Sequence, residues 1–460
     1  MNNRDYCFTL LVGLSMAIIP TYQYSLEDHH KLLLISFDGL RWDYVDRRPD
    51  LESFNILREE GVKAEFLEPP FPSQTSPSHT TLATGLYVES HGVVHNVYYD
   101  RNSTEVVTGD FYRTLAINEW WDNGDEPIWI TASSQGLKSG GYLFPGSNAT
   151  IGGRTATRSI LQTARTSKEE SDWQERIDDV ISWFVEDNFD FIALYFEQPD
   201  SDGHDKGPDD DIIESTTLPI INRTIGYLLS KVQEAGLTDE LNIIIASDHG
   251  MTTVDIDVSF NDVISLVNYV NVSDIFFMFP YAALGLVEPY PNEREKVYNQ
   301  LTGAHPRLNT FYKEDLPEYF HYSNNDRITS IVLTADLGYT MYRVFPGFHI
   351  NKGEHGYDSK LPDMRASFFA IGPSFKKNYI VPGFQSIHVY ELMCHLLGLT
   401  PAPNNGSLDV LYPILRDESL KTTSFTTTNV QSTTSGAQRP GAVVHFLSIL
   451  TLACWLIKHN

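Results

Sequence analysis

Cysteine is scarce in this chain, which has three among its 460 residues. Cys7 and Cys454 lie in apolar segments at the two ends, so only Cys394 falls in the central region. One central cysteine excludes an intramolecular disulfide framework, and Cys394 itself is expected to be a core residue. The hydrophobic content of 42% is sufficient for a large core, in one domain with insertions or in two domains.

Positive charge is also scarce. The chain has 33 lysines and arginines against 60 aspartates and glutamates, and its net charge is -27. Such a surface repels a phosphate backbone, which argues against nucleic acid as a partner. The same surface attracts cations, including a cationic head group.

Both ends of the chain carry apolar runs typical of targeting segments. Residues 1–25 fit a signal peptide, because their apolar part is short for a membrane span. Residues 421–441 are rich in Ser and Thr and predict a solvated stalk. Residues 442–460 predict a hydrophobic membrane anchor, either a lipid-anchor signal or a short single-pass helix. We therefore expect one main domain, residues 26–420, on the extracellular face of the cell membrane.

Five glycosylation sequons are compatible with this secretory route. They are at Asn102, Asn148, Asn222, Asn271 and Asn405.

Apolar, strand-like runs alternate with segments of helical periodicity, which predicts an α/β fold with a mostly parallel sheet covered by helices on both faces. The predicted helices are at 51–60, 171–187, 212–235 and 388–397. Residues 92–145 and 255–350 are expected to be insertions in this fold.

Carboxylates and histidines follow the strand-like runs, where an open α/β sheet places its chemistry. The candidate metal ligands are Asp38, Asp200, His204, Asp248, His249 and His355. Asp200 and His204 are four residues apart and converge if a helical turn forms, and with His355 they make a set suited to zinc. Asp38, Asp248 and His249 make a second set. Taken singly, each residue has a simpler explanation, such as a cap, a turn or a structural histidine.

A metal pair requires a nucleophile, and Thr75 in the segment 71–82 is the candidate. Pro77 is suited to the opening of a helix, so Thr75 would lie near a positive helix end that favours an alkoxide and a phosphate. A hydroxyl becomes a usable nucleophile when a metal binds it. Without the metal ligands, Thr75 would be explained more simply as a helix cap.

Several motifs together resemble the nucleotide pyrophosphatase/phosphodiesterase family of the alkaline phosphatase superfamily. The match covers roughly residues 30–415 and the motifs occur in family order. The motifs are Asp38, the Thr75 segment, and residues 92–96, 197–204, 247–251 and 353–358.

The resemblance implies an alkaline phosphatase-like fold and two zinc ions. One ion would be held by Asp200, His204 and His355, and the other by Asp38, Thr75, Asp248 and His249. Asn96 would donate from its amide to a phosphate oxygen in the transition state. A turn-forming asparagine is the simpler alternative for Asn96.

The net charge of the expected metal site favours a phosphodiester as the substrate. Three carboxylates and a Thr75 alkoxide roughly cancel two divalent ions, so the site would accept a monoanion. The expected course is in-line attack by Thr75, departure of an alcohol and hydrolysis of a phospho-threonine intermediate. A monoesterase is less favoured, because the motifs lack an arginine or lysine for a dianion.

Ser76 bears on the kind of diester, because family members that cleave nucleotides usually carry Phe after the nucleophile. Residues 91–99, 119–124, 127–132 and 353–358 are instead similar to the choline-phospholipid branch of the family, the alkaline sphingomyelinases. This resemblance implies hydrolysis of sphingomyelin to ceramide and phosphocholine in a phospholipase C manner, and of lysophosphatidylcholine and platelet-activating factor, at a membrane or micelle surface.

Aromatic side chains are candidate contacts for such a substrate. A quaternary ammonium favours aromatic faces, for which Tyr98 and Tyr142 are available. Phe276 lies in an apolar run, 275–282, that could accept an acyl chain, although a plain buried strand explains this run more simply.

Two other functions compete with this prediction. A cell-surface nucleotide phosphodiesterase would need a base-binding wall from residues such as Tyr142 or the aromatics near 276. A zinc-stabilised receptor ectodomain without catalysis would need neither Thr75 nor Asn96, so their presence argues against it.

Overall fold

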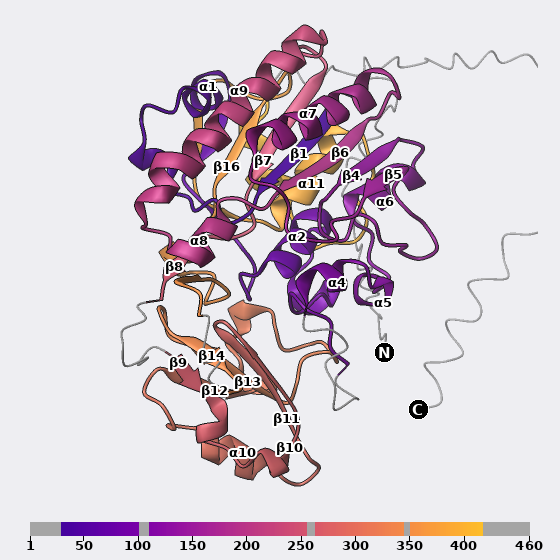
Figure 1. Ribbon diagram of the computed structural model, residues 1–460. Helices are drawn as coiled ribbons and strands as arrows, with labels where there is room; N and C mark the ends of the chain where they lie inside the picture. Colours follow the sequence, from indigo (N-terminus) through magenta and orange to yellow (C-terminus); the bar gives the residue numbers. More distant parts are fainter. Residues whose placement is uncertain (1–28, 101–109, 255–262, 345–349, 417–460) are drawn as a thin grey trace, which may run out of the picture. The chain divides into compact units, whose positions relative to one another are not determined.

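The computed structural model describes residues 29–100, 110–254, 263–344 and 350–416 (Figure 1). The predicted signal peptide, stalk and anchor lie outside these residues, as does the sequon at Asn102. Among the helices that are described, none is long and apolar enough to cross a membrane.

The main element is an eight-stranded sheet with the strand order β17-β2-β16-β7-β1-β6-β4-β5. Strands β7, β1, β6, β4 and β5 run parallel, whereas β16 is antiparallel to both of its neighbours. The mostly parallel sheet predicted from the sequence is therefore confirmed. The strands are β1 (Lys31–Phe37), β2 (Val62–Ala64), β4 (Ser139–Tyr142), β5 (Arg158–Ile160), β6 (Phe191–Phe196), β7 (Leu241–Ala246), β16 (Phe368–Ile371) and β17 (Tyr379–Val381).

Helices cover both faces of the sheet, because its central strands are apolar on both sides. Leu33 and Ile35 of β1 belong to the core under α1, α7 and α9, and Leu32 and Leu34 belong to the core under α2, α6 and α11 (Figure 1). Cys394 is buried in the second of these cores, as expected. The helices are α1 (Glu52–Glu60), α2 (Thr75–Thr84), α6 (Ile128–Ser134), α7 (Glu170–Val185), α9 (Leu218–Glu234) and α11 (His388–Leu396).

The four predicted helices coincide with α1, α7, α9 and α11, with one difference. The segment 212–235 does not form one regular helix, because a π-helical turn at Ile213–Thr217 precedes α9. Pro219 stands in the first turn of α9, where its missing N–H interrupts the α-helical hydrogen-bond ladder.

A second, antiparallel sheet with the order β10-β11-β13-β12 lies within the predicted insertion 255–350. It consists of β10 (Ile275–Tyr281), β11 (Leu284–Pro289), β12 (Leu308–Tyr312) and β13 (Ile331–Ala335), with α10 (Arg294–Leu301) packed against it. Phe277 of β10 stacks on Tyr99, with ring centroids 5.3 Å apart. This contact joins the second sheet to the predicted insertion 92–145.

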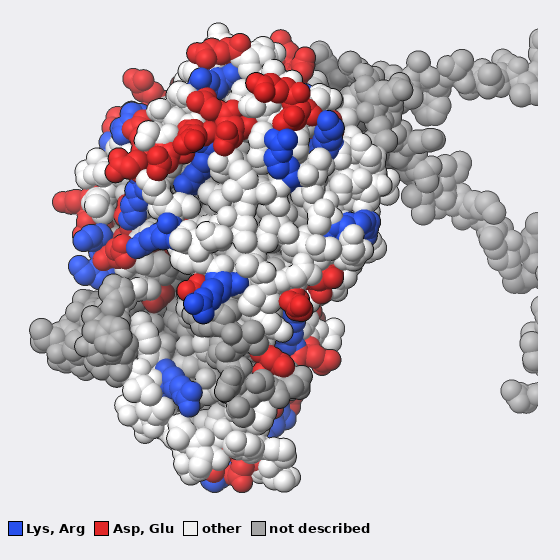
Figure 2. All heavy atoms as spheres, turned by 45° about the vertical axis from the view of Figure 1, so that its right-hand side comes forward, with Lys and Arg blue, Asp and Glu red and all other residues white. Residues whose placement is uncertain are grey.

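The surface is strongly acidic in places. On the face seen in Figure 2, Asp and Glu side chains form a broad band, with Lys and Arg side chains between them. The first turn of α7 carries two acidic residues, Glu170 and Asp172. The band reflects the net charge of -27.

Candidate active site

Candidate metal ligands follow three neighbouring parallel strands and lie at one edge of the sheet. Asp38 follows β1, Asp248 and His249 follow β7, and Asp200 opens α8 (Asp200–Lys206) shortly after β6. The carboxyl ends of adjacent parallel strands meet at one edge, so these side chains converge.

The main chain fixes this convergence. The Asp38 N–H donates to the Phe196 carbonyl at 2.9 Å, and the Asp200 N–H donates to the Asp38 carbonyl at 2.9 Å. Gly39 lies at the point of contact with φ +68°, and a Cβ atom there would be 2.9 Å from the Cα atom of Asp200. Only glycine adopts this conformation without strain and leaves room for the Asp200 backbone.

Asp38, Asp248 and His249 form the first cluster of metal-ligand atoms. His249 Nε2 is 3.3 Å from Asp38 Oδ1 and 3.2 Å from Asp248 Oδ2, and all three residues are buried. Tetrahedral zinc with donors at about 2.0–2.1 Å places two donors about 3.3 Å apart. The spacing of the cluster therefore fits a zinc ion.

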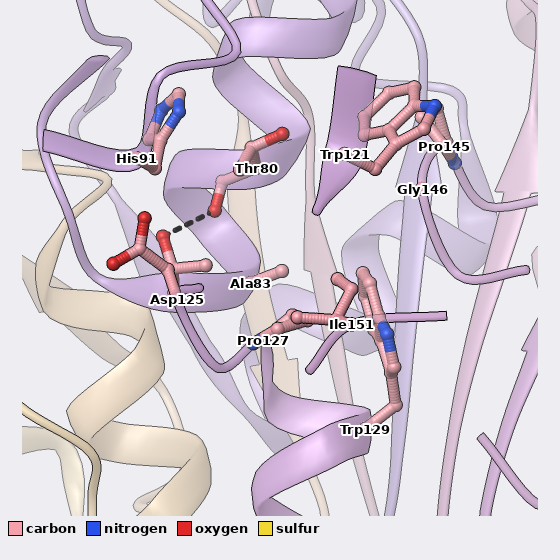
Figure 3. A pocket seen from close by; sticks show the side chains of 11 residues that line it. Thr80, Ala83, His91, Trp121, Asp125, Pro127, Trp129, Pro145, Gly146 and Ile151 are labelled. Atoms are coloured by element: carbon pink, nitrogen blue, oxygen red, sulfur yellow. Dashed lines mark hydrogen bonds between the residues drawn. The ribbon is translucent and has the colours of Figure 1, made fainter. Parts of the chain in front are cut away.

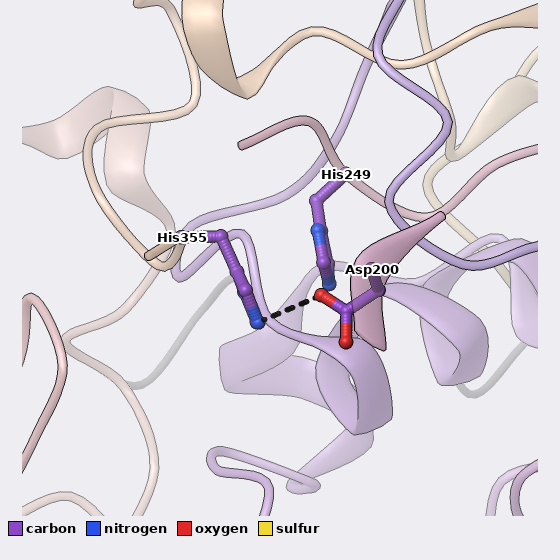
Figure 4. Close-up of side chains that lie close together, drawn as sticks. All are labelled: Asp200, His249 and His355. Atoms are coloured by element: carbon purple, nitrogen blue, oxygen red, sulfur yellow. Dashed lines mark ion pairs between the residues drawn. The ribbon is translucent and has the colours of Figure 1, made fainter. Parts of the chain in front are cut away.

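The second cluster surrounds Asp200 (Figure 4). Asp200 Oδ1 is 3.3 Å from His204 Nε2 and 3.6 Å from His355 Nε2. The imidazole of His249 stacks on that of His355, with centroids 3.6 Å apart and planes 13° apart. The ligand atoms of Asp200, His249 and His355 all lie within 4.8 Å of one another. His249 thus faces both clusters, whereas the sequence assigned it to only one.

Carboxylate oxygens in both clusters have no hydrogen-bond donor. Asp38 Oδ1, Asp200 Oδ1 and Asp248 Oδ2 are buried without a partner among the described residues. Buried polar atoms are rarely left unsatisfied, so these oxygens indicate a bound group that they contact.

The histidines are oriented to complete the same sites. Nδ1 of His249 lies 2.8 Å from the Gly250 carbonyl, and Nδ1 of His355 lies 2.9 Å from the Ser73 carbonyl. Nδ1 of His204 is 2.7 Å from a third carbonyl, that of Gly353. A carbonyl accepts only, so each Nδ1 carries the hydrogen and each Nε2 keeps a lone pair for a metal.

The buried carboxylates of the two clusters also favour a bound cation. Burial raises the pKa of Asp38 well above its ordinary value, and the charges of Asp248 and Asp200 raise it further. Burial would also raise the pKa of Asp200, but the imidazoles of His204 and His355 hold it below its ordinary value. Several carboxylates in one buried site are costly without compensating positive charge, which divalent metal ions supply.

Thr75 is the first residue of α2 and lies beside the first cluster. Its Oγ1 is 3.4 Å from His249 Nε2, and its exposed fraction is 5%. The predicted position at a helix N-terminus is confirmed, since α2 begins at Thr75 with Pro77 in its first turn.

The amide of Asn96 faces the Thr75 hydroxyl. Asn96 Oδ1 accepts the Ser76 N–H at 2.8 Å, and Asn96 Nδ2 lies 3.4 Å from Thr75 Oγ1. Because Oδ1 is engaged by a backbone donor, the amide cannot flip, and Nδ2 presents its hydrogens to the space beside Thr75.

Comparisons with known proteins identify the family of this chain. Residues 32–358 match the family described as type I phosphodiesterase/nucleotide pyrophosphatase. This chain belongs to that family. It is therefore a phosphodiesterase.

Relatives match this phosphodiesterase over most of its length. Ectonucleotide pyrophosphatase/phosphodiesterase family member 7 from Mus musculus is 44% identical and covers 89% of this chain and 93% of its own. The Homo sapiens member 7 is 45% identical and covers 86% of each chain. A bis(5'-adenosyl)-triphosphatase from Xenopus laevis is 36% identical over 88% of this chain and 84% of its own.

A solved structure of murine ectonucleotide pyrophosphatase/phosphodiesterase 5 has the same fold. It is an inactive threonine-to-alanine variant in complex with AMP. It superimposes with a TM-score of 0.77 at 32% identity, covering 84% of this chain and all of the other.

Sequence reasoning missed two buried residues of the phosphodiesterase that support these clusters. Tyr195 donates its hydroxyl hydrogen to Asp38 Oδ2 at 2.5 Å. His79 Nδ1 lies 2.7 Å from the Thr75 carbonyl and 3.4 Å from Asp248 Oδ2, and its Nε2 lies 2.8 Å from Ser36 Oγ. Two signals could have found them: a lone hydroxyl in the apolar run of β6, and a histidine four residues after Thr75.

Tyr281, at the end of β10, also reaches the site. Burial raises the pKa of its hydroxyl, and the nearby charges of Glu354 and Asp200 act in the same direction while a hydrogen bond with Asn96 opposes them. The second sheet therefore contributes a side chain to the candidate active site of the phosphodiesterase.

The three predicted substrate contacts lie in different places. Tyr98 is half-buried with its ring 5.3 Å from that of Trp120, and Phe276 is half-buried with its ring 5.6 Å from that of Tyr290. Tyr142 is in the core under α7, where its hydroxyl donates to Asp179 Oδ2 at 2.9 Å. Within the described residues, these hydrogen bonds and ring contacts do not join the three side chains to the metal-ligand clusters.

The described sequons differ in exposure. Asn271 and Asn405 are exposed, whereas Asn148 and Asn222 are half-buried. Asn222 Oδ1 accepts the Ser53 N–H at 2.9 Å, so its side chain caps the first turn of α1.

Proposed function

We propose that this phosphodiesterase hydrolyses choline phospholipids in a phospholipase C manner, with sphingomyelin giving ceramide and phosphocholine. The observation that carries the proposal is the position of Thr75 Oγ1, 3.4 Å from both His249 Nε2 and Asn96 Nδ2. Lysophosphatidylcholine and platelet-activating factor are further proposed substrates, because they present the same head group.

Two zinc ions are the proposed cofactors. Asp200, His204 and His355 would hold one ion, and the residues that would hold the other are Asp38, Thr75, Asp248 and His249. His249 lies between the two clusters, so its Nε2 atom is close to the ligand atoms of both. When bound, the ions compensate the carboxylates and lower the pKa of a hydroxyl in the site.

Thr75 is the proposed nucleophile. Its Oγ forms a bond to phosphorus in line with the leaving oxygen, the bond to that oxygen breaks, and ceramide departs after taking up a proton. Water then attacks phosphorus, which releases phosphocholine and restores the Thr75 hydroxyl. A threonine-to-alanine variant of the murine relative is inactive, so a threonine is required for activity in a protein of this fold.

Asn96 is proposed to stabilise the transition state. Its Nδ2–H is aimed at the space next to Thr75 Oγ1, where a phosphate oxygen gains negative charge during attack. A preorganised donor of this kind is typically worth about 2.7–4 kcal/mol in the transition state.

Two observations support a lipid rather than a nucleotide. Ser76 is fully buried and offers no ring against which a base could stack. Identity with the bis(5'-adenosyl)-triphosphatases, whose name states a nucleotide substrate, is only 35–36%, against 44–45% with the three family member 7 relatives.

The test compares sphingomyelin in mixed micelles with a nucleotide diester, using the purified full chain supplied with zinc. We expect phosphocholine release by the wild type and its loss in Thr75→Ala. Ser78→Ala is the matched control, since Ser78 is on the same helix, is buried and has no hydrogen-bond partner for Oγ among the described residues.

The other outcomes of this test have distinct meanings. Cleavage of only the nucleotide diester would assign the chain to the nucleotide branch. Zinc binding without hydrolysis of either substrate would favour a receptor ectodomain. Equal loss of activity in Thr75→Ala and Ser78→Ala would indicate damage to α2 rather than loss of a nucleophile.

The ends of the chain complete the proposal. A signal peptide (1–25) would direct the catalytic domain (26–420) to the cell surface, where a stalk (421–441) and a membrane anchor (442–460) would hold it. Treatment of intact expressing cells with a phosphatidylinositol-specific phospholipase C distinguishes the anchor types. Release of activity into the medium indicates a lipid anchor, and retention indicates a single-pass helix.

A further inference from the structure

Glu197 is a buried carboxylate that directly follows β6 and precedes Asp200 in the same turn of chain. Each of its two oxygens accepts two hydrogen bonds. Oε1 accepts from the Tyr112 hydroxyl at 2.8 Å and from Gln162 Nε2 at 2.5 Å. Oε2 accepts from the Thr166 N–H at 2.6 Å and from Thr166 Oγ1 at 2.7 Å. A carboxylate offers about four acceptor positions, so this side chain is fully engaged.

The donors to Glu197 come from two segments outside the eight-stranded sheet. Tyr112 is in α4 (Phe111–Leu115), and the other donors are in the segment 162–168, which lies between β5 and α7. Burial raises the pKa of Tyr112 and the charge of Glu197 raises it further, so the hydroxyl stays protonated and keeps donating. Glu197 therefore joins both segments to the chain that leaves β6.

The segment 162–168 also contacts α8 through two ion pairs. Arg165 Nη2 is 3.2 Å from Asp205 Oδ2, and Lys168 Nζ pairs with Asp202 Oδ1. Both cationic side chains are exposed, so these pairs are screened by water and contribute little. The hydrogen bonds to the buried carboxylate are therefore the main attachment of this segment.

Glu197 is also connected to the start of α8 through its main chain, because its carbonyl accepts the Ser201 N–H at 3.1 Å. The helix carries two of the proposed ligands of one ion, Asp200 and His204, with ligand atoms 3.3 Å apart. A shift of the start of α8 therefore displaces both ligands at once.

We propose that Glu197 is a positioning residue for the Asp200 cluster. It holds Tyr112 and the segment 162–168 against the start of α8, and the helix in turn keeps Asp200 and His204 aligned for one ion. Glu197 does not contact the ion itself, because its acceptor positions are occupied. The inference rests on the proposed zinc ions, so its test includes a measurement that requires no metal.

Asp125 provides a matched control for the removal of a carboxylate. It lines a pocket beside the C-terminal half of α2 that has room for about one water molecule (Figure 3). Its Oδ2 is buried without a hydrogen-bond partner among the described residues. That oxygen does not attach a neighbouring segment to the metal-ligand helix, so Asp125→Ala should leave the ligands undisturbed.

The first measurement is the zinc affinity of the purified full chain, by competition with a chelator of known affinity. We expect Glu197→Ala to weaken one of the two zinc equivalents about 10–100-fold and to leave the other unchanged. Glu197→Gln keeps an acceptor for Thr166 and should weaken that equivalent less than the alanine variant does. Asp125→Ala should bind both equivalents as the wild type does.

The His204→Ala background identifies the ion that is affected. His204 contacts the Asp200 cluster, so this variant should retain the ion of the Asp38 cluster. Adding Glu197→Ala should then leave the affinity for the remaining ion unchanged. A general loss of structure would weaken that ion as well, so this comparison separates positioning from damage to the fold.

Hydrogen–deuterium exchange of the metal-free protein tests the positioning without any ion. Glu197→Ala should speed the exchange of the α8 amides, among them that of Ser201, and leave the exchange of the α9 amides at the wild-type rate. Asp125→Ala should match the wild type in both helices.

Unchanged zinc affinities in Glu197→Ala would overturn the inference, and so would equal weakening of both equivalents. Unchanged exchange in α8 would overturn it as well. A wild type that binds no zinc would contradict the proposed cofactors, and the exchange measurement would then decide the positioning role by itself.

Discussion

The Tyr195 hydroxyl donates to Asp38 Oδ2 at 2.5 Å, so Asp38 Oδ1 remains free and lies 3.3 Å from His249 Nε2. Tyr195 therefore sets which oxygen of Asp38 a metal can bind. Partners of this kind orient the ligands and thereby contribute to metal affinity.

Tyr195→Phe should weaken zinc binding about 10–100-fold, because Asp38 loses the donor that orients it. The measurement is competition for zinc with a chelator of known affinity. Tyr390→Phe is the control, since it removes another buried hydroxyl, which is bonded to Thr131 and the Ala402 N–H. Equal zinc affinities in the wild type and Tyr195→Phe would contradict this role.

His249→Ala and His204→Ala should each lose about one zinc equivalent. Nδ1 of His249 lies 2.8 Å from the Gly250 carbonyl, so only its Nε2 lone pair is available, and that lone pair serves one ion. The His204 contacts are with the Asp200 cluster. Elemental analysis after dialysis should therefore show about one equivalent in each single variant and none in the double variant. Loss of both equivalents from His249→Ala alone would contradict this assignment.

Asn96→Ala should lower kcat about 10²–10³-fold, because the donor aimed beside Thr75 Oγ1 is lost. The zinc content should stay unchanged, since Asn96 Oδ1 accepts the Ser76 N–H and the amide nitrogen Nδ2 offers no lone pair to a metal. An increase in KM with kcat unchanged would instead indicate that Asn96 binds the ground state and the transition state equally.

Acid should destabilise the metal-free protein through His95. Burial lowers the pKa of His95 from 6.5 to about 3, and its Nδ1 accepts the Val97 N–H at 3.1 Å. Between these pH values the unfolded chain binds a proton that the folded chain excludes, so the free energy of unfolding falls as the pH drops below 6.5. The slope is at most about 1.4 kcal/mol per pH unit for this group.

His95→Phe removes this titration while keeping a ring among Tyr99, Phe279 and Tyr281. Urea unfolding at pH 7 and pH 5, with a chelator present throughout, should show a smaller loss of stability in the variant. An identical loss in both proteins would assign the acid sensitivity to other groups.

The sequence predicts the parts of this site that follow strand ends. Asp38 and Asp248 each follow a mostly apolar strand, so their meeting at one sheet edge follows from parallel pairing alone. The position of His249 beside both clusters could not be predicted, because it depends on stacking with His355. His355 lies more than 100 residues later in the chain.

The face on which a strand residue lies depends on register, which the sequence does not fix. Tyr142 pairs with Leu194 in the neighbouring strand, and both belong to the core under α7. Tyr195, one residue further along β6, belongs to the opposite core, under α2. Thus the tyrosine expected to bind substrate lies under α7, and the tyrosine that was overlooked supports a metal ligand.

The contact at Gly39 has a wider consequence for how this enzyme can change. Because backbone hydrogen bonds among Asp38, Phe196 and Asp200 hold the strand ends together, the spacing of the two clusters is a property of the main chain. Substitution of a metal-ligand side chain can abolish catalysis but does not change the spacing of the two clusters. A change of substrate therefore depends on segments outside the eight-stranded sheet, such as the strand that ends at Tyr281.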